Sequence, residues 1–161
     1  MITREVDYAI RAMLCLAVHE EDSVVSTTMM SQEMDIPYRF LRRILLRLVN
    51  AGLVTSTRGK QGGLRLARPA AEISLREVVL ALDPPAFALN ACLLDRTSCH
   101  RTAYCVVHEE LARVQAVMDA HLAEITLAAL AARERARDLR APSPPAPLPG
   151  GEGSDGAGSR S

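Results

Sequence analysis

Three of the four cysteines in this sequence fall within fourteen residues, and a histidine follows the last of them. Cys92, Cys99 and Cys105 have the spacing C-x6-C-x5-C, and His108 comes three positions after Cys105. Thiolates and imidazoles are soft to borderline donors, which bind iron–sulfur clusters or zinc and suit magnesium and calcium poorly. Gaps of five and six residues allow a short loop to turn several sulfurs toward one centre. We therefore interpret the stretch 92–108 as a metal-binding loop.

An iron–sulfur cluster is the favoured occupant of this loop. The stretch has no C-x2-C pair, which argues against an ordinary zinc finger. A structural zinc site, metal-free redox thiols and inert cysteines remain as alternatives. If a helix begins near Tyr104, His108 lies one turn after Cys105 on the same face, and both could reach one metal. His108 could instead be a solvated histidine at a helix start, but three nearby cysteines favour the ligand interpretation.

The composition predicts one domain with a modest core. The chain has 161 residues, no Trp and 3% aromatic residues, so aliphatic side chains must fill the interior. No apolar run is long enough to span a bilayer, and Glu5, Asp7 and Arg11 interrupt any signal peptide at the N-terminus. We therefore expect a cytoplasmic protein without a membrane partner. In that compartment thiols stay reduced, and clustered cysteines are more often ligands than disulfides.

The net charge of zero conceals a segregation of charge. Residues 37–68 contain eight basic side chains and no acidic one, whereas the rest of the chain has eleven basic and nineteen acidic residues. A basic segment in a neutral chain is typical of a nucleic-acid surface. A solvated helix face followed by a charged loop is the alternative. It accounts poorly for more than thirty residues without a single carboxylate.

The basic segment follows two shorter helical patterns. Thr3 can cap a first helix over residues 3–20, and Ser26 can begin a second that ends at Asp35-Ile-Pro37. A third helix, 37–50, has an apolar face and an opposite face of arginines (Arg39, Arg42, Arg43 and Arg47). A short helix, a turn and a basic amphipathic helix predict a helix-turn-helix, in which the last helix reads the major groove.

Two strand-like runs, 53–57 and 64–67, flank the glycine-rich segment 58–63. A β-hairpin directly after a basic helix is typical of the wing of a winged helix, where glycines allow close approach to phosphate. The order G-K-x-G-G does not fit the nucleotide-binding P-loop. Further on, Ser74-Leu-Arg-Glu77 is a capping box, which predicts a helix through Leu82.

The C-terminal third predicts one long helix and a tail. Apolar residues recur at spacings of three and four in the segment 104–137; they are Leu111, Val114, Met118, Leu122 and Ile125. A single helix of that length would be on the order of 45 Å long, more than a small domain can cover. Its exposed stripe predicts a homodimer, with intramolecular packing as the alternative. Residues 141–161 are rich in Pro, Gly and Ser and are predicted to be disordered.

Together these parts resemble the IscR/NsrR family of dimeric winged-helix transcription factors, the Rrf-type regulators. The resemblance covers about residues 1–130. It rests on the opening run 3–13, the helix-turn-helix, the wing 58–63, the run 73–79 and the three-cysteine loop. Asp35 stands where members of the family often have glycine in the turn, and we expect the turn to form because Asp tolerates the left-handed conformation.

The resemblance implies that Cys92, Cys99 and Cys105 bind an iron–sulfur cluster that reports iron supply, nitric oxide or redox state. It leaves two candidates for the fourth ligand. IscR-like members use a histidine at the position of His108 and hold a 2Fe–2S cluster. NsrR-like members use an acidic residue of the first helix, donated by the other subunit, at the position of Asp7, and hold a 4Fe–4S cluster.

We therefore expect a mainly α-helical protein with a small β-hairpin wing. Its expected parts are a winged helix-turn-helix DNA-binding domain (1–82), a cysteine-rich cluster-binding loop (83–103), a dimerisation helix (104–140) and a disordered tail (141–161). The expected function is that of an iron–sulfur transcriptional regulator, most simply a repressor, and not of an enzyme. A zinc-stabilised or cluster-free thiol-based winged-helix regulator is the alternative. The expected DNA contacts are Tyr38, Arg39, Arg42, Arg43, Arg58 and Lys60, on a double-stranded operator bound by a homodimer.

Overall fold

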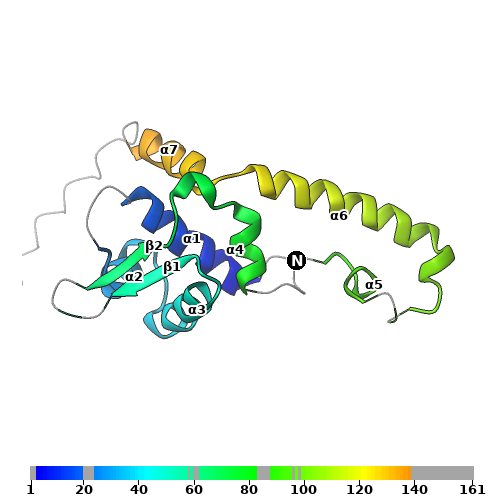
Figure 1. Ribbon diagram of the computed structural model, residues 1–161, viewed down its shortest axis with the longest axis horizontal. Helices are drawn as coiled ribbons and strands as arrows, with labels where there is room; N and C mark the ends of the chain where they lie inside the picture. The colour runs from blue at the N-terminus through cyan, green and yellow to red at the C-terminus, as the bar shows by residue number, and fades with distance from the viewer. Residues whose placement is uncertain are drawn as a thin grey trace, which may run out of the picture.

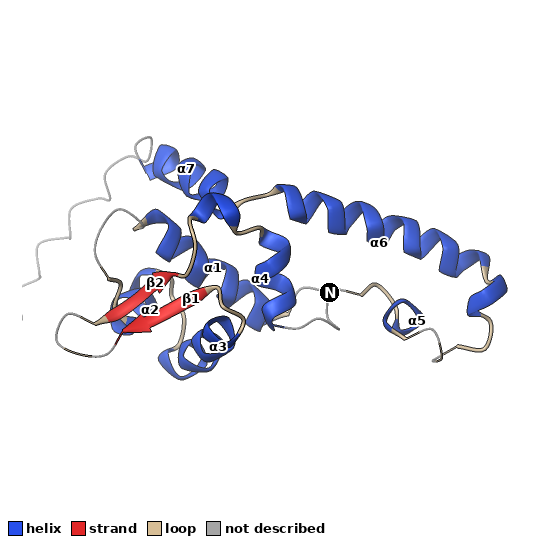
Figure 2. Cartoon of the chain, in the orientation of Figure 1, coloured by secondary structure: helices blue, strands red, loops and turns tan. Residues whose placement is uncertain are grey.

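The computed structural model describes residues 3–19, 24–57, 59, 62–82, 88–95, 97 and 99–138. In this part of the chain the fold is mainly helical, with a single two-stranded antiparallel sheet (Figures 1 and 2). The predicted mainly α-helical class with a small β-hairpin is confirmed. The predicted tail, 141–161, lies outside the described residues, as do Arg58 and Lys60.

Helix α1 (Arg4–Val18) is the centre of the core. The Thr3 side chain accepts a hydrogen bond from the Val6 N–H at 3.4 Å, so the predicted N-cap is confirmed. One face of α1 is fully buried and packs against three later helices, namely α3 (Tyr38–Asn50), α4 (Leu75–Leu82) and α7 (Leu127–Asp138). The buried side chains of α1 are Val6, Ala9, Ala12, Met13, Cys15, Leu16 and Ala17. Most are small, which lets neighbouring helices approach α1 closely.

Helices α2 (Thr27–Glu33) and α3 (Tyr38–Asn50) form the predicted helix-turn-helix. The Ser26 hydroxyl caps α2 by accepting from the Met29 N–H at 3.1 Å. In the turn, Asp35 has φ 50°, the left-handed conformation expected of it. The Ser31 hydroxyl donates to the Ile36 carbonyl at 2.6 Å and holds the turn against α2. These contacts fix the angle at which α3 leaves the turn.

Strands β1 (Val54–Thr57) and β2 (Gly63–Leu66) pair antiparallel, with Val54 opposite Leu66. The predicted hairpin after the basic helix is confirmed. Val25 forms an isolated antiparallel bridge with Leu64 of β2, in which the two residues exchange backbone hydrogen bonds of 2.9 and 3.1 Å. A Cβ at Gly63 would lie 2.9 Å from the Val25 carbonyl oxygen, so this close approach requires glycine.

Helix α4 (Leu75–Leu82) follows a short 3₁₀ turn, η1 (Ala70–Glu72), and begins with the predicted capping box. The Glu77 carboxylate accepts from the Ser74 N–H at 2.9 Å, while the Glu77 N–H donates to the Ser74 hydroxyl at 3.3 Å. Arg68 donates to the same carboxylate at 2.6 Å. Burial alone would raise the pKa of Glu77, but the hydrogen bonds from Ser74 and Arg68 outweigh it and lower the pKa below its usual value.

Glu77→Ala should lower the free energy of unfolding by about 1 kcal/mol at neutral pH, since it removes a helix cap. A carboxylate with a lowered pKa stabilises the fold above its unfolded-state pKa, and the stabilisation is lost as pH falls through the folded-state pKa. The difference from wild type should therefore shrink below about pH 4. Urea unfolding of both proteins at neutral pH and below about pH 4 measures this difference in the free energy of unfolding. Glu124→Ala, at an exposed position, is the control, and an equal loss in both variants would contradict the capping role.

The prediction of one helix over 104–137 is wrong. A 3₁₀ turn, η3 (Thr102–Tyr104), precedes α6 (Val106–Glu124), and a separate helix, α7 (Leu127–Asp138), follows it. Between α6 and α7, Thr126 forms an antiparallel bridge with Ser74. The Ile125 carbonyl accepts from the Leu75 N–H at 2.8 Å, and the Leu127 N–H donates to the Ile73 carbonyl at 2.9 Å.

Tertiary pairing accounts for this break, because the backbone at residues 125–127 bonds to the segment 73–75 instead of continuing the helix. Helix α7 then returns to the core and packs on α1, where Leu127 and Ala131 are buried. The Arg135 guanidinium donates to the carbonyls of Ala17 and Val18 at 3.0 and 2.7 Å, which satisfies the C-terminal end of α1. The last helix is thus part of the N-terminal domain.

Helix α6 extends away from the rest of the protein, with the short helix α5 (Ala91–Leu94) beside it (Figure 1). With nineteen residues it is about 28 Å long, shorter than the single helix expected from the sequence. None of its residues is buried. Val106, Val107, Val114, Val117 and Met118 are exposed large apolar side chains on α6. This apolar surface has no cover within the described residues of one chain.

Candidate metal centre and nucleic-acid interface

The three clustered cysteines and His108 line one pocket of about 190 Å³ between α5 and the start of α6. The other lining residues are Asn90, Ala91, Val107 and Leu111. All three cysteines are half-buried free thiols. Cys92 and His108, which are sixteen positions apart in the sequence, therefore line the same pocket. Its lining combines soft donor atoms with apolar side chains. This is an arrangement that can hold a metal or a cluster.

Local turns place Cys92 and Cys99 at this pocket. Helix α5 carries Cys92, and the Asn90 side chain caps that helix by accepting from the Ala91 N–H at 2.7 Å. The Asp95 carboxylate accepts from the N–H and hydroxyl of Thr97 at 2.8 and 2.7 Å, bonds that lower the pKa of Asp95. The Cys99 carbonyl accepts from the Thr102 hydroxyl at 2.8 Å. Among the described residues of the loop, each of these turns is therefore closed by hydrogen bonds between close neighbours.

Helix α6 places the other two donors. Cys105 is its N-cap residue, and His108 lies one turn further along the same face, as the spacing predicts. The Nδ1 atom of His108 lies 3.3 Å from the Sγ atom of Cys92. His108 is therefore in hydrogen-bond contact with a cysteine of α5, and the two elements meet at this pair.

The donors of the pocket are spread more widely than one ion requires. A zinc ion holds thiolates at about 2.3 Å, so its ligands lie about 3.8 Å from one another. Among the described residues, Cys15, His19 and Glu33 form a group of three donors within 4.8 Å of one another, and no three donors of the cysteine pocket do so. The donors of the cysteine pocket are therefore farther apart than Cys15, His19 and Glu33 are.

Asp7, the other candidate for the fourth ligand, lies elsewhere in this chain. It is on the first turns of α1, where its carboxylate pairs with Arg11 at 2.9 Å, and both side chains are 46% exposed. It is not among the residues that line the cysteine pocket of its own chain.

The exposed face of α3 carries the predicted DNA-contacting residues. Leu41, Ile44, Leu45 and Leu48 are buried on the opposite face. Tyr38 is 49% exposed at the first turn, and Arg39, Arg42 and Arg43 are exposed beside it. The Arg39 guanidinium lies 4.8 Å from the centroid of the Phe40 ring, which helps to hold it at the surface. The face therefore presents cations and a phenol to solvent.

One acidic residue, Glu5 of α1, pairs with this face, and the sequence did not indicate it. Its carboxylate bonds to Arg43 and, at 3.2 Å, to Arg47. Within the described part of the chain, no ion pair involves Arg39 or Arg42. The lack of acidic residues in the segment 37–68 therefore does not mean that every arginine in it lacks an acidic partner. Arg39 and Arg42 are the arginines of α3 most available for phosphate or base edges.

The hairpin lies next to α3, as a wing does, and its tip requires glycine. Gly59 has φ 118°, a conformation open to few other residues, and its carbonyl accepts from the Gly62 N–H at 2.9 Å. The two predicted wing cations, Arg58 and Lys60, lie outside the described residues.

The fourth cysteine, Cys15, is fully buried in α1, as its apolar sequence neighbours indicate. Burial raises the pKa of its thiol to about 12, and the nearby Glu33 carboxylate contributes to the rise. The free side chain is thus a neutral thiol at physiological pH, which makes it a poor nucleophile. Its proximity to Glu33 and His19 was not expected, because Glu33 comes from a different helix.

None of the described helices is both long enough and apolar enough to cross a lipid bilayer.

The sequence profile of the Rrf2 family, described as iron-dependent transcriptional regulators, matches residues 2–133. A helix-turn-helix transcriptional regulator of Azotobacter vinelandii is 33% identical over 138 residues, which cover 86% of this chain and 83% of that protein. The regulator IscR of Photobacterium profundum is 36% identical over 104 residues, 65% of this chain and 56% of that protein.

Two solved structures share the fold. IscR of T. potens superposes with a TM-score of 0.69 at 23% identity, over 89% of this chain and 93% of that one. CymR, the global cysteine regulator of B. subtilis, gives a TM-score of 0.67 at 23% identity, over 83% and 97%. The winged-helix architecture is thus shared, and the sequence relatives are transcriptional regulators rather than enzymes. The chain belongs to the Rrf2 family of transcriptional regulators.

Proposed function

We propose that this regulator holds an iron–sulfur cluster on Cys92, Cys99 and Cys105 and acts as a homodimeric repressor in the cytoplasm. The pocket that joins these three thiols to one imidazole is the observation that carries the proposal. When bound, the cluster would supply a centre sensitive to iron supply, oxidation and nitric oxide. The IscR relatives support the same assignment.

The donor set fits a cluster better than the alternatives. Three half-buried thiols and an imidazole are soft to borderline donors. The lack of a C-x2-C pair in the sequence weighs against an ordinary structural zinc site. A zinc-stabilised or cluster-free thiol-based regulator remains the second candidate, since this chain also shares its fold with the cysteine regulator CymR. Iron, sulfide and zinc analysis of the wild type beside a triple variant (Cys92→Ser, Cys99→Ser and Cys105→Ser) separates the candidates, because only a metal held by the pocket is lost in the variant.

The exposed face of α3 suits the major groove of an operator. Arg39, Arg42 and Arg43, with Tyr38, are proposed to contact bases and phosphates, and the wing cations Arg58 and Lys60 to contact phosphates. In a homodimer two α3 helices would enter successive major grooves, about 34 Å apart, on a roughly palindromic site. The uncovered apolar side chains of α6 suit a second copy of α6 as the dimer contact.

A continuous series of packed elements connects the pocket to the DNA-reading helix. Helix α5 packs on α6, α6 on α4, and α4 on both α1 and α3. Arg76 of α4 donates to Asp119 of α6 at 2.6 Å and joins those two helices. A change in how Cys92 and His108 are held could therefore move α6 against α4, and with it the separation of the two α3 helices. Such coupling requires that cluster binding differ between two conformations.

The direct test is a gel-shift titration of full-length holo protein and chelator-treated apo protein on one operator fragment. The proposal predicts affinities that differ by about 5- to 150-fold, the usual range of coupling between two sites. Equal affinities would remove the sensing role. They would leave the DNA-binding function intact.

The fourth ligand can be assigned by comparing His108→Ala with Asp7→Ala. We expect His108→Ala to alter the absorption and Mössbauer spectra of the holo protein and Asp7→Ala to leave them unchanged, because His108 lies 3.3 Å from Cys92 Sγ in the same chain. The reverse outcome would assign the ligand to Asp7 of the second subunit. Both residues are outside the buried core, so both variants should fold.

A further inference from the structure

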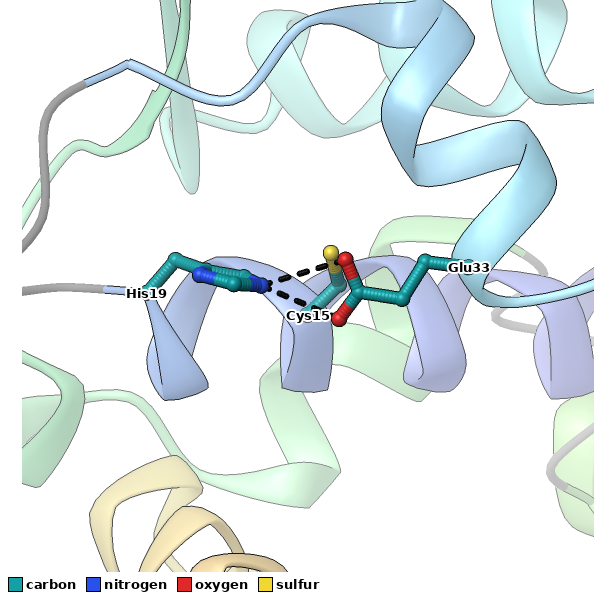
Figure 3. Close-up of side chains that lie close together, drawn as sticks. All are labelled: Cys15, His19 and Glu33. Atoms are coloured by element: carbon teal, nitrogen blue, oxygen red, sulfur yellow. Dashed lines mark hydrogen bonds and ion pairs between the residues drawn. The ribbon is translucent and has the colours of Figure 1, made fainter. Parts of the chain in front are cut away.

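A second group of metal-binding side chains lies at the contact between α1 and α2, outside the cysteine pocket. The Cys15 sulfur, the His19 imidazole and the Glu33 carboxylate have donor atoms within 4.8 Å of one another (Figure 3). Nε2 of His19 lies 3.0 and 3.1 Å from the two Glu33 oxygens. In Figure 3 the sulfur lies beside this pair, so all three donors face one point.

The helices account for the convergence. Cys15 and His19 are four residues apart, one turn of α1, and the His19 N–H donates to the Cys15 carbonyl at 3.1 Å. Glu33 is the last residue of α2, which packs on α1. The cysteine is fully buried, whereas the side chains of His19 and Glu33 are 25% and 35% exposed. The group therefore lies at the edge of the core, with its sulfur buried and its imidazole and carboxylate partly exposed to solvent.

The donor types and charges select the ion. A thiolate, an imidazole and a carboxylate are ligands of zinc, whereas magnesium and calcium require oxygen donors. One thiolate and one carboxylate balance the two charges of the ion. Three protein ligands leave a fourth tetrahedral position for water, which fits the partly exposed side of the group. Ligands of one zinc ion lie about 3.8 Å apart, within the 4.8 Å limit that these donors meet.

We propose that Cys15, His19 and Glu33 bind a zinc ion that joins α1 to α2. Binding replaces the sulfur–hydrogen bond of Cys15 with a sulfur–zinc bond, and the proton passes to solvent without any electron transfer. Glu33 is followed directly by the turn that sets the angle of α3. Zinc at this position would therefore hold the helix-turn-helix against the central helix of the core. The site shares no ligand with the proposed cluster and does not depend on it.

Cobalt titration of a full-length variant with serine at positions 92, 99 and 105 isolates the site, because Cys15 is then its only thiol. The three replaced cysteines lie outside the buried core, so the variant should fold. We expect one cobalt ion per chain, visible bands of tetrahedral cobalt and a near-ultraviolet sulfur-to-cobalt charge-transfer band. Zinc should displace the cobalt. Absence of the charge-transfer band at saturating cobalt would overturn the proposal.

Further substitutions in the same background identify the ligands. Cys15→Ala should abolish the charge-transfer band. His19→Gln and Glu33→Gln should each weaken zinc binding by at least about tenfold, because even residues that only support a ligand cost about that much when they are replaced. His121→Gln, an exposed histidine on α6, is the matched control and should bind zinc unchanged. Unchanged affinity in both the His19 and Glu33 variants would overturn the assignment.

Thermal unfolding gives an independent measurement. Zinc at about one hundred times its dissociation constant should raise the Tm of the background variant by about 5–10 °C. No such rise should occur with Cys15→Ala. If Cys15→Ala fails to fold, the partly exposed His19 and Glu33 variants still decide the question, and a full zinc-dependent rise in both would contradict the site.

Discussion

Cys99→Ser protein should be purified without oxygen. It should then contain less iron and acid-labile sulfide per chain than the wild type, by a factor of at least about ten. The serine hydroxyl is a hard donor and a poor replacement for a thiolate on iron. The loss should not reflect unfolding, because Cys99 is half-buried in a locally closed loop and is not part of the core. Iron and sulfide assays with a visible spectrum measure the effect, and thermal unfolding checks the fold.

Cys15→Ala is the matched control for this result, since it removes the one cysteine outside the pocket. It should keep the iron, the sulfide and the colour of the wild type. Cys92→Ser and Cys105→Ser should behave as Cys99→Ser does. Full iron content in Cys99→Ser, or an equal loss in Cys15→Ala protein that is folded by circular dichroism, would contradict the assignment of the pocket.

Arg42→Ala should weaken operator binding by about 5- to 150-fold for each half-site, which corresponds to about 1–3 kcal/mol for a specific base contact. Arg42 is exposed on α3, and none of the ion pairs among the described residues involves it. Arg43→Ala should weaken operator binding less than Arg42→Ala does, because the Arg43 guanidinium already pairs with the Glu5 carboxylate. In a homodimer each subunit contributes one Arg42, so the free-energy losses at the two half-sites add. Fluorescence anisotropy with a labelled operator measures the affinity.

Arg113→Ala is the control for charge, because it removes one exposed arginine from α6, where Arg113 pairs with Glu110. It should bind the operator with nearly wild-type affinity at the same salt concentration. If Arg42 contacts a base, its variant should also discriminate less at one operator position; if it contacts phosphate, the salt dependence should fall by about one unit of slope. Equal losses in both arginine variants would show that only net charge matters.

Local patterns predicted the DNA-binding part of the fold well. The caps at Thr3 and Ser26, the capping box of Ser74 and Glu77, and the left-handed Asp35 all depend on residues a few positions apart. The apolar face of the third helix and the hairpin after it follow from periodicity, which is also a local property. For these elements the sequence contains both partners of each interaction within one turn or one hairpin.

The errors concern contacts between distant segments. The apolar pattern continues to Ile125, so periodicity alone cannot show that the backbone of residues 125–127 pairs with residues 73–75 and ends α6. Glu5 and Arg43 are likewise far apart in the sequence, as are His19 and Glu33. Only packing of α1 against α2 and α3 brings these pairs together. The cysteine pocket was easier to predict, because all of its donors lie between 92 and 108.

Whether Cys92, Cys99 and Cys105 hold a cluster is tested most directly by anaerobic purification of the full-length protein, followed by a visible spectrum and by iron, sulfide and zinc analysis. If they do, the protein should be coloured and should contain iron and acid-labile sulfide in similar amounts, which depend on these three cysteines. A colourless protein with neither iron nor sulfide would contradict this prediction, and the chain would then be an Rrf2-family regulator that responds to something other than an iron–sulfur cluster.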